Sequence, residues 1–280
     1  MSVSVFRPET VEELFCLMET EPVPHYFLAG GTDLLVQAKD GAIPPSTWFD
    51  VTALRELTGI RVEEGRVVLG AAVTHDELTR SDTVRHYAPA LVDGAAVIGG
   101  PQIRNRGTVG GNLANGSPAA DTVPALYTLE AEVGLRRRAA LRWVAIADFF
   151  LGPRKTLLEP GEIIEAVRFP AREGMRGAFV RLGQRRSQAI SKVSVAVSCV
   201  VSGDRFEYLG IACGSVAPTV IRCPRAEAAL RERGLAGASE ACRLIREEVR
   251  PIDDIRSTAA YRRAMSGVLL ARVLETLALT

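Results

Sequence analysis

The 280-residue sequence contains no two glycines separated by a single residue, and no glycine is followed by lysine. The first absence excludes the G-x-G-x-x-G fingerprint of Rossmann dinucleotide-binding domains. The second excludes the Walker A loop of P-loop proteins. A nucleotide bound by this chain must therefore be held by another arrangement of backbone donors.

Cysteine and histidine are scarce and scattered. The five cysteines include no C-x-x-C pair, and the three histidines, His25, His75 and His86, lie far apart in the sequence. These spacings exclude the usual zinc and iron–sulfur ligand sets, so no metal site is expected in this chain. We interpret the cysteines as small buried residues and the histidines as structural or surface residues.

The sequence also lacks an excess of one charge and a long apolar run. The formal net charge is +1, which argues against a nucleic-acid partner. The longest nearly apolar segment, residues 193–201, suits a buried strand better than a membrane span. The first ten residues contain no apolar leader, so a soluble, cytoplasmic protein without membrane insertion is expected.

Two glycine pairs are present, each flanked by hydroxyl residues. Gly30 and Gly31 follow a strand-like apolar segment, and Gly110 and Gly111 lie within residues 107–121. Successive N–H groups in such loops can form a concave site, or nest, for an anion such as a phosphate. An ordinary tight turn requires the same residues and is the alternative for either loop alone. The presence of both loops favours a diphosphate held from two sides.

Sequence patterns predict an α+β chain of two domains. Thr10 with Glu13, and Thr74 with Glu77, have the spacing of capping boxes and predict two helix starts. Two β-branched runs joined by E-E-G predict a hairpin with glycine in the left-handed conformation. A charged, glycine-rich stretch at residues 173–177 predicts a boundary between domains 1–173 and 174–280.

The predicted C-terminal domain contains three strands, at residues 177–182, 193–202 and 208–215, followed by helices. Asp121 lies in the first turn of a helix that is predicted to follow Pro118. A carboxylate there stabilises the helix dipole, and this capping role is the alternative to a contact with a ligand.

The two glycine loops resemble the paired FAD-binding signatures of the medium subunit of molybdenum hydroxylases. The similar segments are A-G-G-T-D-L-L at residues 29–35 and T-V-G-G-N-L-A-N-G-S-P-A-A-D at residues 108–121. Further similar segments extend over nearly the whole chain. The T-D pair after the first glycines, together with G-P-Q-I-R-N at residues 100–105, is most similar to the FAD-binding subunit of bacterial xanthine dehydrogenases.

This resemblance implies a two-part FAD-binding domain of the vanillyl-alcohol oxidase (PCMH) type and a smaller C-terminal α+β domain with a three-stranded antiparallel sheet. FAD is expected to be non-covalent, because neither glycine loop contains histidine. Residues 27–34 and 108–112 would hold the diphosphate from opposite sides. The full set of cofactor-binding residues that the resemblance implies is Phe27, Leu28, Ala29, Gly30, Gly31, Thr32, Asp33, Leu34, Ile98, Thr108, Val109, Gly110, Gly111, Asn112, Ser117, Asp121, Ile164 and Arg181.

Four of these residues would lie beyond the diphosphate. Asp121 would contact the ribose or adjoining groups, Ile98 and Ile164 would pack on the flavin, and Arg181 would supply a basic group near it. No catalytic acid or base is expected in this chain, because the flavin itself accepts electrons one at a time and releases them as a hydride.

The resemblance also implies partners. The molybdenum cofactor and [2Fe-2S] clusters would belong to a large molybdenum-binding subunit and a small iron–sulfur subunit, in a dimer of heterotrimers, and NAD⁺ or another carrier would accept the electrons. Xanthine, nicotinate, aldehyde and carbon monoxide systems use similar flavin subunits, so the substrate stays open. The competing functions are a stand-alone flavin oxidase and a non-catalytic phosphate-binding module.

Overall fold

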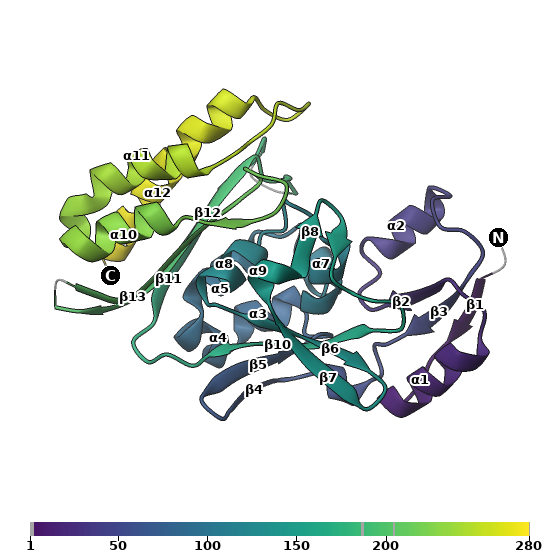
Figure 1. The fold of residues 1–280 in the computed structure, drawn as a ribbon. Coiled ribbons are helices and arrows are strands. Elements are labelled where there is room, and N and C mark those ends of the chain that lie inside the picture. Colours follow the sequence, from purple (N-terminus) through teal and green to yellow (C-terminus); the bar gives the residue numbers. More distant parts are fainter. Residues whose placement is uncertain (1–2, 186–187, 204, 280) are drawn as a thin grey trace.

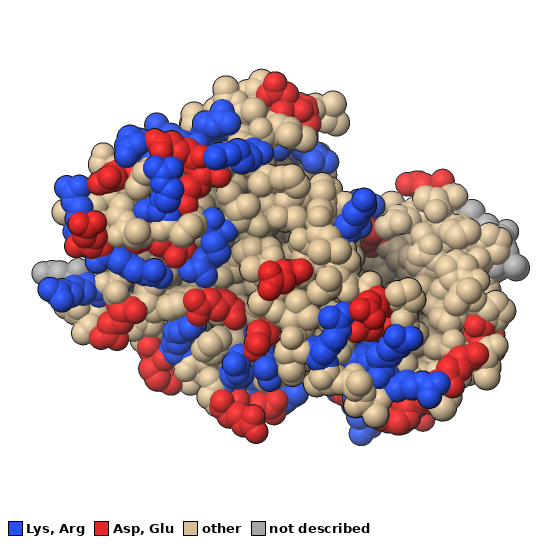
Figure 2. Space-filling view, in the orientation of Figure 1, with Lys and Arg blue, Asp and Glu red and all other residues tan. Residues whose placement is uncertain are grey.

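The computed structural model describes residues 3–185, 188–203 and 205–279 (Figure 1). The chain forms an N-terminal lobe (residues 3–57), a central lobe (residues 58–170) and a C-terminal domain (residues 176–279). The fold is α+β, as predicted. Within the described ranges, no helix is both long and apolar enough to cross a membrane. Figure 2 shows acidic and basic side chains intermixed over the visible face, as the small net charge leads one to expect.

The N-terminal lobe is a three-stranded parallel sheet in the order β1-β3-β2. Parallel pairing follows from the helices that link successive strands, since they return the chain to the same edge. Thr10 caps the first helix by accepting a hydrogen bond from the Glu13 N–H at 3.1 Å, as predicted. The elements are β1 (Val3–Phe6), α1 (Val11–Thr20), β2 (His25–Leu28), α2 (Leu34–Lys39), β3 (Ser46–Asp50) and the 3₁₀ helix η1 (Arg55–Leu57).

The central lobe contains a five-stranded antiparallel sheet in the order β4-β5-β10-β6-β7. The predicted hairpin is confirmed: β4 and β5 join at Glu64 and Gly65, which both have positive φ. The strands of the five-stranded sheet are β4 (Ile60–Glu63), β5 (Arg66–Gly70), β6 (Glu132–Arg137), β7 (Ala140–Ala145) and β10 (Ile163–Pro170). Separately, the short strand β8 (Phe150–Gly152) pairs with β9 (Lys155–Thr156).

Seven helices of the central lobe connect these strands. The capping box predicted at Thr74 and Glu77 is complete, with each side chain bonded to the other's backbone. The helices are α3 (His75–Arg80), α4 (Asp82–Tyr87), α5 (Pro89–Ala96), α6 (Pro101–Arg104), α7 (Val109–Asn115), α8 (Val123–Thr128) and α9 (Ile146–Phe149).

The C-terminal domain contains the three predicted antiparallel strands and a short fourth one at the edge, in the order β11-β12-β13-β14. Three helices and a 3₁₀ turn cover one face of this sheet, and helices of the central lobe cover the other (Figure 1). The elements are β11 (Arg176–Leu182), β12 (Val193–Ser202), β13 (Arg205–Gly214), β14 (Ile221–Arg222), α10 (Pro224–Arg233), η2 (Gly234–Gly237), α11 (Ala238–Glu248) and α12 (Ala259–Leu279).

Glycine allows the C-terminal sheet to approach the central lobe closely. A Cβ built on Gly210 of β13 would lie 2.6 Å from the carbonyl oxygen of Thr128, at the end of α8. Because the clash is with backbone, α8 and β13 would have to move apart to make room for this Cβ. The contact therefore fixes how the two parts of the chain are packed.

We predict that Gly210→Ala lowers the free energy of unfolding by about 1–3 kcal/mol, the usual cost of overpacking a close contact. Gly152→Ala is the control, because a Cβ at Gly152 would meet no atom within 4 Å. Urea denaturation of the two variants and the wild type measures the difference. Equal stability of Gly210→Ala and the wild type would contradict this account of the packing.

Candidate functional site

A hollow of about 470 Å³ lies between the N-terminal lobe and the central lobe. Figure 2 shows a recess where Figure 1 places α2 beside α7. One wall comes from β2, α2 and the loop between them, and the other comes from α6, α7 and the segment between those helices. A smaller hollow of about 130 Å³ adjoins it and shares Phe27, Ala29, Thr108, Gly111 and Ala114.

The two glycine loops touch at the bottom of this site. A Cβ built on Gly30 would lie 1.9 Å from the carbonyl oxygen of Arg106 and 2.9 Å from Cα of Gly107. Only glycine allows that contact, so the identity of Gly30 is explained by close approach between the lobes. The predicted convergence of the two loops is thus present in the fold.

The second glycine loop does not offer free backbone donors. Thr108 is the N-cap of α7, and all four N–H groups that follow it are bonded within the chain. The bonds are Val109 N to Val73 O (2.9 Å), Gly110 N to Ala71 O (2.8 Å), Gly111 N to Thr108 Oγ1 (3.1 Å) and Asn112 N to Thr108 O (2.9 Å). The anion nest predicted for this loop is therefore wrong. Gly110 serves packing instead, because its Cβ would lie 2.7 Å from that of Ala71.

The first glycine loop has the free donors that the second lacks. Among the described residues, no acceptor is hydrogen-bonded to the backbone N–H groups of residues 30–33. Gly31 has φ of +70°, the left-handed conformation found in backbone nests. Four successive unpaired N–H groups on the wall of a hollow suit a phosphate group. The residues present therefore fit the diphosphate of FAD.

Most of the predicted site residues line these hollows. Those on the larger hollow are Phe27, Ala29, Gly30, Gly31, Thr32, Asp33, Leu34, Ile98, Thr108, Gly111 and Asn112. Gly110 and Ile164 line the smaller one. Five predicted residues line neither hollow, namely Leu28, Val109, Ser117, Asp121 and Arg181.

Asp121 and Arg181 bond to each other across the boundary between the central lobe and the C-terminal domain. The Asp121 carboxylate accepts from Arg181 Nη1 at 2.6 Å and from Ser191 Oγ at 2.5 Å. Arg181 also donates to the carbonyl oxygens of Val97 (2.6 Å) and Ala189 (2.9 Å). Burial raises the pKa of Asp121, and the hydrogen bond from Ser191 and the charge of Arg181 oppose that rise.

The capping role considered for Asp121 is wrong. Helix α8 begins at Val123, its N-cap is Thr122, and no side chain caps it by a hydrogen bond. Because the Asp121 carboxylate is already bonded to Arg181 and Ser191, it neither caps this helix nor faces the hollow.

Two residues on the wall of the larger hollow were given no binding role by the sequence. His75 is the first residue of α3 and only 2% exposed, and its Nδ1 is enclosed without a hydrogen-bond partner. The Arg154 guanidinium has no hydrogen-bond or ion-pair partner within the described parts of the chain. Arg154 lies in F-F-L-G-P-R-K-T at residues 149–156, one of the further segments that resemble the family, whereas an isolated histidine carries no sequence signal.

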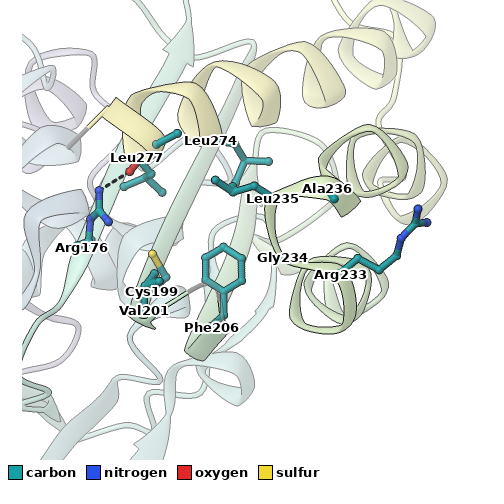
Figure 3. Close-up of a pocket in the computed structure, with 12 residues that line it drawn as sticks. Arg176, Cys199, Val201, Phe206, Arg233, Gly234, Leu235, Ala236, Leu274 and Leu277 are labelled. Atoms are coloured by element: carbon teal, nitrogen blue, oxygen red, sulfur yellow. Dashed lines mark hydrogen bonds between the residues drawn. The ribbon is translucent and has the colours of Figure 1, made fainter.

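Another hollow, of about 460 Å³, lies in the C-terminal domain and shares no residue with the site between the lobes. Figure 3 shows its apolar side chains from β12, β13, η2 and α12, with Arg176 at one side. The Arg176 guanidinium donates to the carbonyl oxygen of Leu277. This hollow is lined mainly by apolar side chains and contains neither of the two glycine pairs, so the site between the lobes is the better candidate for a nucleotide.

His75 makes the stability of the chain depend on pH. Burial and the nearby charge of Arg104 lower the pKa of His75 from 6.5 to about 4. The unfolded chain therefore binds more protons between these values, and the free energy of unfolding falls as the pH falls through that window. Between pH 7 and pH 4.5, we predict that the free energy of unfolding of His75→Leu falls by about 2 kcal/mol less than that of the wild type, as measured by urea denaturation. Equal losses would show that His75 is not held neutral in the folded chain.

The arrangement matches known families over both parts of the chain. Residues 1–172 match the family described as the FAD binding domain in molybdopterin dehydrogenase. Residues 178–277 match the CO dehydrogenase flavoprotein C-terminal domain.

Individual relatives match this chain over nearly its full length. The chain is 34% identical over 274 residues to the carbon monoxide dehydrogenase medium chain of Hydrogenophaga pseudoflava, covering 96% of this chain and 94% of that one. It is 32% identical over 280 residues to the xanthine dehydrogenase FAD-binding subunit of Escherichia coli O157:H7, covering 97% and 94%. A solved structure of carbon monoxide dehydrogenase from Hydrogenophaga pseudoflava superimposes with a TM-score of 0.92 at 32% identity, covering 99% and 97%. The chain therefore belongs to the FAD-binding medium subunits of the molybdenum hydroxylases, a family in which the molybdenum cofactor and the iron–sulfur clusters belong to partner subunits.

Proposed function

We propose that this chain passes electrons from the iron–sulfur clusters of a small partner subunit, through non-covalent FAD, to NAD⁺ or another acceptor. The observation that carries the proposal is the run of unpaired N–H groups at residues 30–33, on the wall of a hollow that the second glycine loop closes. Bound FAD supplies the redox chemistry, and the protein binds and orients it. We place the FAD-binding domain at residues 1–173 and the C-terminal domain at residues 174–280.

Different residues of the hollow contact different parts of FAD in this proposal. The N–H groups of residues 30–33 hold the diphosphate, and the free guanidinium of Arg154 offsets its charge. Ile98 and Ile164 present apolar surface to the flavin ring. Asp121 and Arg181 are bonded to each other, so we assign them the role of fixing the C-terminal domain against the central lobe. This role replaces the direct contacts with the ribose and the flavin that the resemblance implied.

The xanthine dehydrogenase type is our first candidate for the whole enzyme, in a dimer of heterotrimers with a large molybdenum-binding subunit. The support is the Thr32–Asp33 pair and the segment at residues 100–105. Relatives named for carbon monoxide, xanthine and nicotinate are 32–38% identical to this chain, and one named for glyceraldehyde is 27% identical. The carbon monoxide, nicotinate and aldehyde types are therefore the alternatives. The complex purified from its native host should be reduced faster by xanthine than by nicotinate, an aldehyde or carbon monoxide. Faster reduction by another substrate would contradict the xanthine assignment and leave the electron-transfer role intact.

We predict that Gly30→Ala weakens FAD binding by about 5- to 150-fold, because the added Cβ collides with the Arg106 carbonyl and overpacking costs about 1–3 kcal/mol. In the assembled complex, substrate should still bleach the iron–sulfur absorbance of this variant, whereas reduction of the acceptor should fail. Gly152→Ala is the control and should keep both steps. Acceptor reduction at the wild-type rate by Gly30→Ala complexes without FAD would contradict the proposed electron path.

Assays of the isolated chain distinguish the proposed function from the competing ones. We expect the purified subunit to bind FAD and to be yellow, yet to oxidise none of these substrates without its partners. A colourless chain that does not take up FAD would favour a phosphate-binding module. A yellow chain that oxidises a substrate alone would favour a stand-alone oxidase.

A further inference from the structure

We propose that His75 binds FAD directly: its neutral imidazole donates a hydrogen bond from Nε2 to an oxygen of the diphosphate. This inference rests on the FAD site proposed above and adds a side-chain donor to the backbone donors of residues 30–33. His75 precedes the second glycine loop by more than thirty positions in the sequence and belongs to neither signature segment.

The fold places the His75 ring beside the contact between the two glycine loops. A Cβ built on Gly107 would lie 3.1 Å from Cδ2 and 3.5 Å from Nε2 of this ring. Gly30 is packed against the same glycine, since its own Cβ would lie 2.9 Å from Cα of Gly107. A hydrogen bond from the His75 backbone N–H to the Gly107 carbonyl, 2.9 Å long, fixes the helix start that carries the ring.

The ring has unused hydrogen-bonding capacity in a place where that is costly. Nδ1 is enclosed without a partner, and no described residue forms a hydrogen bond with Nε2. Buried polar side chains in folded proteins almost always use their hydrogen-bonding atoms. Nε2, unlike Nδ1, is not fully enclosed, so the unpaired Nε2 is the ring atom that a partner entering the hollow can reach. The other two histidines are engaged: His25 with the Glu21 carbonyl at 3.0 Å, and His86 with the Glu173 carboxylate at 2.8 Å.

The chemistry of the ring suits a phosphate oxygen. Burial and the charge of Arg104 lower the pKa of His75 to about 4, so the imidazole is neutral near pH 7 and carries one N–H and one lone pair. When the proton is on Nε2, this nitrogen can donate a hydrogen bond, and the enclosed Nδ1 carries only a lone pair. A phosphate oxygen accepts such a bond. The cationic charge for the diphosphate then comes from Arg154 on the wall of the hollow and not from His75.

Binding of FAD and of ADP to the FAD-free full-length chain, measured by calorimetry, tests this inference. We expect His75→Leu to weaken both ligands about tenfold, as for the loss of one hydrogen bond to a charged group. His75→Gln keeps an N–H near the position of Nε2 and should remain within about threefold of the wild type. His86→Leu, outside the hollow, is the control. The melting temperature of ligand-free His75→Leu should not fall, because the substitution removes an unpaired buried atom.

Nuclear magnetic resonance of the His75 ring gives a second readout. Addition of ADP should shift the Nε2–H resonance and raise the ring pKa above about 4, because the diphosphate stabilises the protonated ring. Unchanged ADP affinity in His75→Leu, or a ring that does not respond to ADP, would overturn the inference. If the wild-type chain bound neither FAD nor ADP, the proposed function would fail as well. If the wild-type chain bound both ligands but His75 neither responded to ADP nor affected its affinity, only this inference would fail.

Discussion

The backbone contact between Gly30 and the Arg106–Gly107 peptide is the constraint on which the site depends. It brings a loop of the N-terminal lobe within van der Waals distance of a loop of the central lobe, and a single methyl group at Gly30 would separate them. The contact is made by main-chain atoms, and among the described residues the N–H groups of residues 30–33 have no hydrogen-bond acceptor. Close approach and free donors thus arise from the same short segment.

The two glycine pairs solve different physical problems although they look alike in sequence. At Gly30 and Gly31 the backbone donors stay free, so that loop can hold an anion. At Gly110 and Gly111 the donors are bonded to Ala71 and Thr108, and the missing side chain at Gly110 lets α7 pack on the residue after β5. A glycine pair is therefore a signal for close backbone approach, and only the hydrogen-bond partners show whether it binds a ligand.

Local patterns predicted much of the fold. The cap at Thr10, the capping box at Thr74, the E-E-G hairpin and the three strands of the C-terminal domain all depend on residues near one another in the sequence. The roles of Asp121, Arg181 and His75 were not readable in this way, because their neighbours come from distant segments. Asp121 and Arg181 are sixty residues apart, and their pairing is decided by how the C-terminal sheet packs on α5 and α8.

The placement of the hollow between two lobes has a consequence for the binding of FAD. The apolar cluster around Phe49 belongs mostly to the N-terminal lobe and includes Ile163 of β10, whereas the cluster around Leu126 joins the central lobe to the C-terminal domain. A dinucleotide seated in the hollow would touch both lobes, so its binding free energy adds to the cohesion of the lobes, and closer association of the lobes in turn raises affinity for the dinucleotide. We therefore expect FAD binding and the packing of the two lobes against each other to stabilise one another.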